Sequence, residues 1–115
     1  MNVTIYHNPK CGTSRTTLSL LQEAGIELKI IEYLKDPVSR DELEALIEKM
    51  PSTVRDLIRT NGDLYKNLGL NDEKLNDEQL LDALLENPIL MQRPVVESAK
   101  GVRICRPADT VKEIL

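Results

Sequence analysis

The sequence of 115 residues predicts an α/β protein built on one mixed β-sheet. Three observations support this fold class. Residues 2–33 have the pattern of a strand, a helix and a strand, residues 95–115 have that of two strands and a helix, and the stretch between them shows mainly helical spacing of apolar side chains. A mixed sheet follows, because the first pattern implies parallel strands and the second an antiparallel hairpin.

The first unit begins with Asn2–Tyr6, where polar and apolar side chains alternate as in a strand. Residues 8–12 contain a proline and a glycine, which indicate a loop. Ser14 is expected to cap a helix whose leucines recur at helical spacing, and Gly25 should end that helix. Leu28–Tyr33 is the second strand. Because a helix connects the two strands, we expect them to be parallel.

The central stretch, about residues 39–87, is expected to be a helical block with breaks at Pro51 and Asn61-Gly62, and residues 63–75 are ambiguous between a short helix and a turn. Capping boxes at 39–42 and 76–79 each mark the start of a helix with an apolar face. Residues 52–60 and 64–68 have the spacing of two further short helices between them. Asn87-Pro88 should close the last helix, because a residue that precedes proline is disfavoured in helical conformation.

The last unit consists of a hairpin and a helix. Val95–Ser98 and Val102–Cys105 are its strands, Lys100-Gly101 is the turn between them, and a helix starts at Arg106-Pro107. A βαβ unit and a ββα unit that share one four-stranded sheet make a thioredoxin-like fold. We therefore expect a single domain over residues 1–115, with a helical insertion at about 39–87 between its halves.

Composition and charge exclude several classes of protein. The chain has 15 Lys+Arg against 19 Asp+Glu, a net charge of −4, and neither Phe nor Trp, which argues against general nucleic-acid binding. No apolar run approaches the ~20 residues of a membrane span, and the N-terminus lacks the pattern of a signal peptide. A cytoplasmic protein is therefore expected, with a monomer as the default. Two cysteines and one histidine predict neither a disulfide framework nor a metal site.

Cys11 is the strongest candidate for chemistry. The predicted fold places its reactive cysteine after the first strand, where the N–H groups of a helix start lower the pKa of a thiol. Ser14 occupies the position at which a dithiol motif would have its second cysteine. Cys105 lies 94 residues later in a predicted strand, where a buried structural role is favoured. We therefore expect Cys11 to need an external thiol, such as glutathione or a dithiol protein.

The polar residues around Cys11 are candidates for assisting it. His7 precedes Cys11 by four positions and could stabilise the thiolate as an imidazolium or carry a proton, although a plain hydrogen-bonded loop histidine is an equally good interpretation. Asn8, Thr13 and Ser14 belong to the same loop and could donate hydrogen bonds to an anion. We expect His7 to be auxiliary.

Arg59, Arg93 and Arg106 form a second candidate set, since each lies at the boundary of a predicted element. Three guanidinium groups directed at one point would bind a multiply charged oxyanion. In thioredoxin-like domains a proline, commonly cis, precedes the third strand and packs beside the reactive cysteine. Pro94 has that position, so Arg93 should lie near Cys11. The sequence by itself does not establish that the three arginines converge.

The motifs together resemble the glutaredoxin-coupled, glutathione-dependent arsenate reductases of the ArsC type. The resemblance extends over essentially the whole chain, and its most specific segments are residues 7–15, 54–59, 65–70, 88–96 and 102–107. It implies that the Cys11 thiolate attacks arsenate and forms a covalent thiol–arsenate adduct. Glutathione then attacks, glutaredoxin reduces the mixed species and arsenite is released, with no bound cofactor. The resemblance also implies that Arg59, Arg93 and Arg106 hold the oxyanion and that His7 helps the thiolate.

Two other functions stay open on the sequence alone. One is a glutathione-dependent oxidoreductase that acts on other thiols or disulfides. The other is a non-enzymatic redox regulator of the same superfamily, but such regulators commonly have Cys-x-x-Cys, and Ser14 departs from that pattern. The presence of all three arginines favours oxyanion chemistry.

Overall fold

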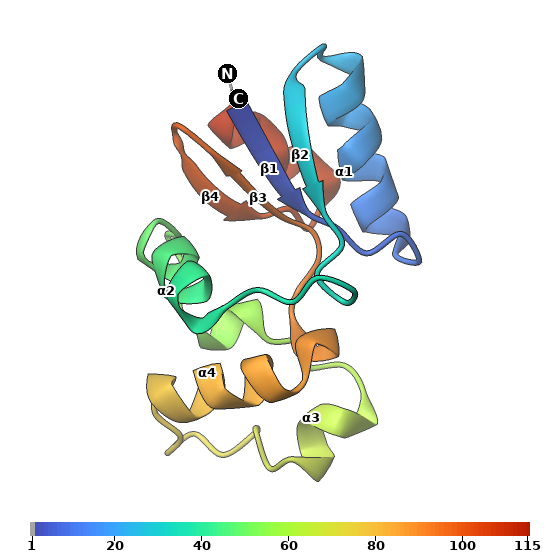
Figure 1. Ribbon diagram of the computed structural model, residues 1–115. Coiled ribbons are helices and arrows are strands. Elements are labelled where there is room, and N and C mark those ends of the chain that lie inside the picture. The colour runs from blue at the N-terminus through green and yellow to red at the C-terminus, as the bar shows by residue number, and fades with distance from the viewer. Residues whose placement is uncertain (1) are drawn as a thin grey trace.

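The computed structural model describes residues 2–115 and is organised around a four-stranded sheet in the order β2-β1-β3-β4 (Figure 1). The strands are β1 (Asn2–Tyr6), β2 (Glu27–Ile31), β3 (Val95–Ser98) and β4 (Gly101–Ile104). β1 runs parallel to β2 and antiparallel to β3, and β3 and β4 form an antiparallel hairpin. This topology is the thioredoxin-like arrangement that the sequence predicts.

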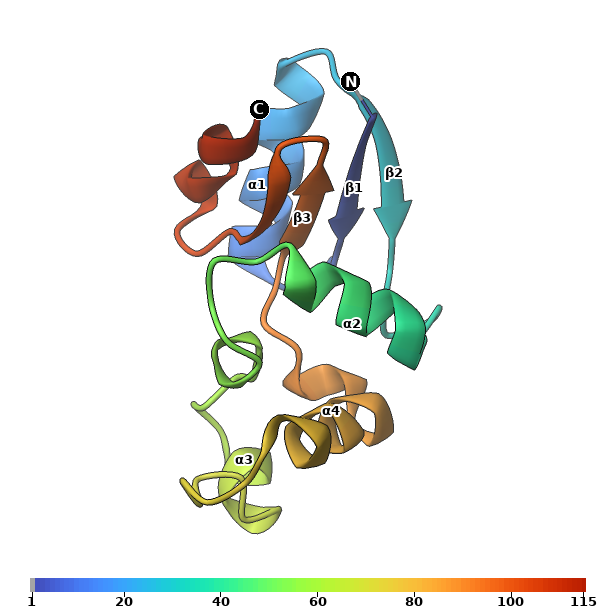
Figure 2. The ribbon, with the colours of Figure 1, turned by 90° about the vertical axis from the view of Figure 1, so that its left-hand side faces the viewer.

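The two faces of the sheet belong to two apolar clusters, because successive side chains of a strand point to opposite sides. On one face, Ile5 and Val96 pack with α1 (Gly12–Glu23) and with the 3₁₀ helix η3 (Ala108–Ile114). On the other face, Tyr6 and Val95 pack with α2 (Arg40–Glu48) and with the helices that follow it. Figure 2 shows α1 and α2 on these opposite sides.

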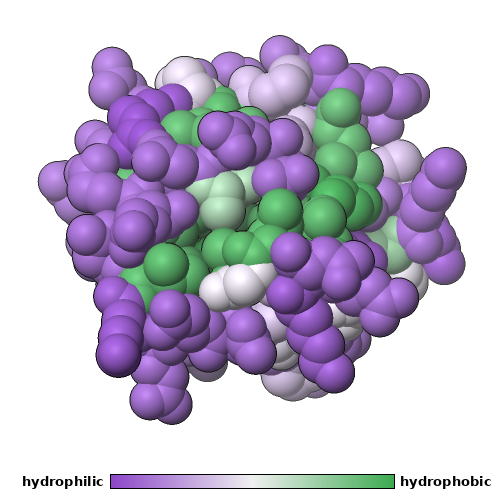
Figure 3. Space-filling view, turned by 90° about the horizontal axis from the view of Figure 1, so that it is seen from below, coloured by the Kyte–Doolittle hydropathy of each residue, from purple (hydrophilic) through white to green (hydrophobic). Residues whose placement is uncertain are grey.

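The helical insertion extends beyond the end of the sheet (Figures 1 and 2). After α2 it contains the 3₁₀ helix η1 (Arg55–Leu57), α3 (Asp63–Asn67), α4 (Asp77–Glu86) and the 3₁₀ helix η2 (Pro88–Leu90). Its buried leucines continue the cluster that covers the α2 face of the sheet. Seen from this end of the molecule, apolar side chains show through a largely hydrophilic surface (Figure 3).

Arg55 ties the first part of the insertion together. Its Nη1 donates to the hydroxyl of Tyr65 (3.2 Å) and to the carbonyl of Leu70 (2.7 Å), and its Nη2 donates to the carbonyl of Asp72 (2.9 Å). The start of α4 is secured separately by a complete capping box between Asn76 and Gln79. The stretch 68–75 contains no helix or strand, and the three hydrogen bonds of the Arg55 guanidinium group hold part of it in place.

The bounds of several elements differ from those expected. α1 begins at Gly12 with Cys11 at its N-cap position, so Ser14 lies in the first turn and does not cap the helix. β2 ends at Ile31, because the carbonyl of Glu32 accepts the N–H groups of residues 35 and 36 and closes a turn. The stretch 52–60 contains a single 3₁₀ turn, and the last helix is 3₁₀ in form.

Within residues 2–115, none of the helices combines the length and the apolar character needed to cross a membrane.

Candidate active site

The loop between β1 and α1 carries Cys11 to the start of a helix. The side-chain Oδ1 of Asn8 accepts the N–H of Lys10, and the Asn8 carbonyl accepts the N–H of Cys11, both at 3.0 Å. These bonds turn the chain sharply after Asn8. Cys11 then has an extended backbone, while its carbonyl already accepts the N–H of Arg15, which is the geometry of an N-cap. Its side chain therefore faces the free N–H groups of the first turn.

The Cys11 thiol is half-buried and hydrogen-bonded to cationic groups. Burial raises the pKa of this thiol, but hydrogen bonds from the Ser14 backbone N–H and from the side chains of Arg93 and Arg106 lower it, as does the charge of Arg93. The net result is a pKa below the ordinary value of a cysteine. The Nη1 of Arg106 lies 3.6 Å from the sulfur. The site thus favours the thiolate, which is the nucleophilic form.

Arg93 and Arg106 act directly on this sulfur, and Arg59 lies close enough for its charge to interact with both of these arginines and with Cys11. The Nη1 of Arg106 also donates to the backbone carbonyl of Arg93 (2.9 Å), so one guanidinium group touches both Cys11 and Arg93. Burial lowers the pKa of Arg59, and the charges of Arg93 and Arg106 lower it further, whereas Tyr33 and Cys11 raise it. The structure therefore brings together three residues that lie far apart in the sequence.

Arg93 has two buried nitrogen atoms without a partner. Its Nε and Nη1 are inaccessible to solvent, and neither makes a hydrogen bond within the described chain. Buried donors are almost always satisfied, since an unmade hydrogen bond costs about 1–3 kcal/mol and more for a charged group. These donors belong to the guanidinium group that also acts on the Cys11 thiol.

A short antiparallel contact holds Arg59 against the segment that carries Arg93. The N–H of Arg59 donates to the carbonyl of Leu90, and the N–H of Gln92 donates to the carbonyl of Leu57, both at 2.7 Å. Between these two bonds, Ile58 and Met91 form an isolated β-bridge. The two ends of the helical insertion are thus joined to each other beside Arg59, just before the chain enters β3.

His7, Asn8 and Ser14 form a buried group behind the cysteine. The Oγ of Ser14 lies 2.6 Å from Nδ1 of His7 and accepts the backbone N–H of Asn8 at 3.1 Å. Burial lowers the pKa of His7, the charge of Glu32 opposes this, and the charge of Arg15 adds to it. His7 therefore favours the neutral form. The hydrogen bonds to the Cys11 thiol come from Ser14, Arg93 and Arg106, while Nδ1 of His7 is engaged by Ser14.

The structure places the other candidates as follows. Thr13 is half-buried in the first turn of α1, and its carbonyl accepts the hydroxyl of Thr17 at 2.9 Å. The peptide bond between Arg93 and Pro94 is cis, as expected. Cys105 is fully buried among apolar side chains, and burial raises the pKa of its thiol to about 12. The expected burial is confirmed, but β4 ends at Ile104, so Cys105 follows the strand and does not belong to it. Such a thiol is a poor partner for Cys11.

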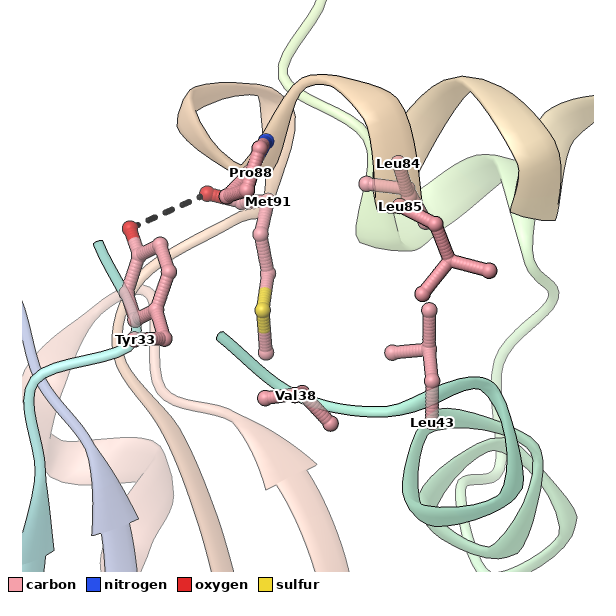
Figure 4. Close-up of a pocket in the computed structure, with 7 residues that line it drawn as sticks. All are labelled: Tyr33, Val38, Leu43, Leu84, Leu85, Pro88 and Met91. Atoms are coloured by element: carbon pink, nitrogen blue, oxygen red, sulfur yellow. Dashed lines mark hydrogen bonds between the residues drawn. The ribbon is translucent and has the colours of Figure 1, made fainter. Parts of the chain in front are cut away.

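Tyr33 adjoins the site and was not predicted from the sequence. It is 1% exposed, and its hydroxyl donates to the carbonyl of Met91 at 3.5 Å (Figure 4). Burial raises its pKa, and the charges of Arg93, Cys11 and Arg59 all act on its hydroxyl, as does a hydrogen bond from the Asn8 side chain. One signal could have identified it. Tyr33 follows β2, and the carboxyl ends of the parallel strands β1 and β2 lie at the same edge of the sheet.

The arrangement suits attack by a thiolate on a small oxyanion. Cationic donors neutralise the negative charge that would otherwise repel a thiolate, and the helix start adds N–H groups on the same side. No cluster of His, Cys, Asp and Glu within residues 2–115 could hold a metal ion.

Comparison with known proteins identifies close relatives over the whole chain. A sequence model of the ArsC family matches residues 6–114. A Rhizobium meliloti protein described as an arsenate reductase is 55% identical over 115 residues, which are 100% of this chain and 82% of that one. An arsenate reductase of Escherichia coli (strain K12) is 50% identical over 114 residues, covering 99% and 81% of the two chains. The solved structure of an arsenate reductase from Vibrio cholerae superposes with a TM-score of 0.95 at 43% identity, covering 100% and 98%.

Proposed function

Because this chain belongs to the ArsC family, we propose that it is an arsenate reductase in which Cys11 is the nucleophile and Arg59, Arg93 and Arg106 hold the oxyanion. One observation carries the assignment of these roles. The two buried and unpartnered nitrogens of Arg93 lie in the group of cations that surrounds the Cys11 thiol. Arsenate, a tetrahedral oxyanion, supplies acceptors for such donors.

The first step joins sulfur to arsenic. The Cys11 thiolate attacks arsenate, an S–As bond forms, and one As–O bond breaks as its oxygen takes up a proton and leaves as water. Asn8, Thr13 and Ser14 line the same loop, and we assign them to binding and shaping the anion site. Pro94 holds the segment of Arg93 against it. His7 acts as a neutral auxiliary through Ser14, because its Nδ1 is already engaged there.

Reduction then requires two electrons, which come from two thiols that end as a disulfide. Overall, one arsenate and two thiols yield one arsenite, one disulfide and one water. Cys105 is buried and is not available as the second thiol. We assign these thiols to glutathione and glutaredoxin, and we place the enzyme in the cytoplasm, where thiols are kept reduced.

Arsenate turnover tests the proposal directly. Arsenate, glutathione, glutaredoxin, NADPH and glutathione reductase are combined, and NADPH oxidation is followed. We expect turnover by the native chain and by Cys105→Ser, and none above background by Cys11→Ser. Equal turnover by the native chain and Cys11→Ser would remove Cys11 from the mechanism. Turnover of glutathionylated peptides but not of arsenate would instead favour a general thiol–disulfide oxidoreductase.

A further inference from the structure

A surface groove adjoins the proposed oxyanion site on the side of the helical insertion. It lies between the segment that follows Arg59 and the 3₁₀ helix η2, and its lining consists of Arg59, Asn61, Gly62, Leu64, Tyr65, Ile89 and Leu90. Arg59 belongs to both the groove and the oxyanion site. In Figure 1 the yellow-green segment after Arg59 lies on the same side of the molecule as the blue loop that carries Cys11.

The proposed reaction needs a thiol that enters from outside, and this requirement rests on the proposed function. Cys105 is fully buried, and its pKa of about 12 keeps it protonated, so it cannot react with an adduct on Cys11. The incoming thiol has to reach the Cys11 sulfur past its cationic surroundings. A groove that shares Arg59 with the oxyanion site offers such an approach.

The lining of the groove favours an anionic ligand with polar and apolar parts. Arg59 is its single charged lining residue, and the neighbouring charges of Arg93 and Arg106 add to the positive potential at that end. The hydroxyl of Tyr65 accepts a hydrogen bond from Arg55, so its own proton remains free to be donated outward. Ile89 provides an apolar rim that is 43% exposed.

We propose that this groove binds a short anionic thiol peptide of the glutathione type. Its thiol points toward Cys11, a carboxylate lies at the Arg59 end, and the rest of the peptide contacts Tyr65 and Ile89. The chemistry of the groove matches such a ligand, since its lining joins the cationic Arg59 of the oxyanion site to uncharged polar and apolar residues. The groove thereby selects the reductant, whereas the three arginines select the oxyanion.

Charge variants of Ile89 test the proposal against a matched control. A carboxylate at this rim repels an anionic peptide, so we expect Ile89→Glu to raise the KM for glutathione about fivefold, the order of one like-charge contact near a surface. Ile89→Lys should leave that KM unchanged or lower it. Leu68→Glu is the control, because Leu68 is 44% exposed on the same insertion but does not line the groove. Equal effects of Ile89→Glu and Leu68→Glu would overturn the proposal.

A binding measurement keeps this test independent of turnover. S-methylglutathione cannot react, so its titration into the ¹⁵N-labelled native chain reports binding alone. We expect amide shifts concentrated at residues 61–65 and 89–90, and their loss in Ile89→Glu. Shifts elsewhere, or none, would overturn the groove assignment even if arsenate is reduced. Shifts at the groove without arsenate turnover would support the groove and reject the proposed function. An Ile89→Glu defect confined to the KM for glutaredoxin would show a protein-docking surface and reject the peptide ligand.

Discussion

Cys11 is both the proposed nucleophile and the residue at the N-cap of α1. An N-cap side chain faces the N–H groups of the first turn, and the backbone N–H of Ser14 lowers the pKa of the Cys11 thiol. A thiolate is a better acceptor than a thiol, so ionisation of Cys11 and the start of α1 support each other. The side chains of Arg93 and Arg106 add to this effect from the other half of the chain.

Replacement of Arg93 by glutamine should weaken both the thiolate and the anion site. Loss of its charge removes two of the causes that lower the pKa of Cys11, so the pH profile of Cys11 alkylation by iodoacetamide should shift upward. Loss of charge-assisted hydrogen bonds, each about 1.5–3 kcal/mol, should raise the KM for arsenate about tenfold or more. Arg103→Gln is the control, since Arg103 pairs with Glu113 at the surface. An unchanged alkylation profile in Arg93→Gln would contradict this account.

His7 should make the free energy of unfolding fall as the pH falls below about 6.5. Its pKa is lowered in the folded protein from 6.5, so below about pH 6.5 the unfolded chain binds a proton that the folded chain resists. The contribution of neutral His7 to stability is complete above this pH and is lost as the pH falls toward the folded pKa. Urea unfolding between pH 5 and 7.5 should show a flatter profile in His7→Gln than in the native chain. Parallel profiles would mean that His7 titrates alike in both states.

The sequence predicted the positions of some site residues but not of others. Cys11 and Arg93 could be placed near each other because a loop before a helix and a proline before a strand are local signals. The position of Arg59 could not be derived in this way, since it depends on the pairing of residues 57–59 with residues 90–92. Tyr33 was missed because an aromatic residue at the end of an apolar strand has the same pattern as any core residue.

At the scale of elements, the start of a helix could be predicted from the sequence where a capping side chain binds the N–H groups of its first turn. Ser39 and Asn76 both accept hydrogen bonds at the N-termini of their helices, as their sequence context indicated. The start of α1 was not predicted, because the side-chain Oδ1 and the backbone carbonyl of Asn8 together close a turn that brings the chain into the helix earlier than Ser14. The sequence predicted the 3₁₀ segments as helices but could not distinguish 3₁₀ from α-helix. The choice between hydrogen bonds to residue i+3 and to residue i+4 depends on how the surrounding chain packs.

Arg55 should be the residue on which the irregular part of the insertion depends. Arg55→Met removes three hydrogen bonds and leaves the part-buried carbonyl of Leu70 and the exposed carbonyl of Asp72 without this donor, which should lower the free energy of unfolding by about 1–3 kcal/mol. Hydrogen exchange of residues 63–75 should accelerate most. Arg40→Met serves as the control, because Arg40 makes only exposed ion pairs with Glu44, Glu78 and Asp82, and such pairs contribute little. A uniform acceleration over the whole chain would instead show that Arg55 supports the global fold.

At the scale of the whole molecule, the sheet joins two apolar clusters into one structure. Val95 and Val96 are adjacent in β3, yet they belong to different clusters, and both are fully buried. We expect Val95→Ala and Val96→Ala each to lower the free energy of unfolding by about 2 kcal/mol within a single transition. Urea unfolding followed by far-UV circular dichroism and by tyrosine fluorescence should give coincident curves. Separate transitions for the two signals would mean that the insertion and the sheet unfold independently.

Net charge was a poor guide to the ligand. The chain carries a charge of −4, which by itself disfavours anionic substrates. Its acidic side chains, however, lie largely on exposed helix faces, whereas Arg93 and Arg106 act on the Cys11 sulfur and Arg59 lies within range of their charges. A sum over the sequence contains no information about this local arrangement, which only the fold creates.

The short pairing of residues 57–59 with residues 90–92 brings together the two ends of the intervening chain, so that this chain forms one closed loop. Its two ends are pinned beside Arg59 and Arg93, so its interior can change length without moving either guanidinium group. The closure entropy of a loop rises only slowly with length. The exposed stretch 71–74 is consequently the place where a peptide tag or a reporter could be spliced into this enzyme with the anion site left intact.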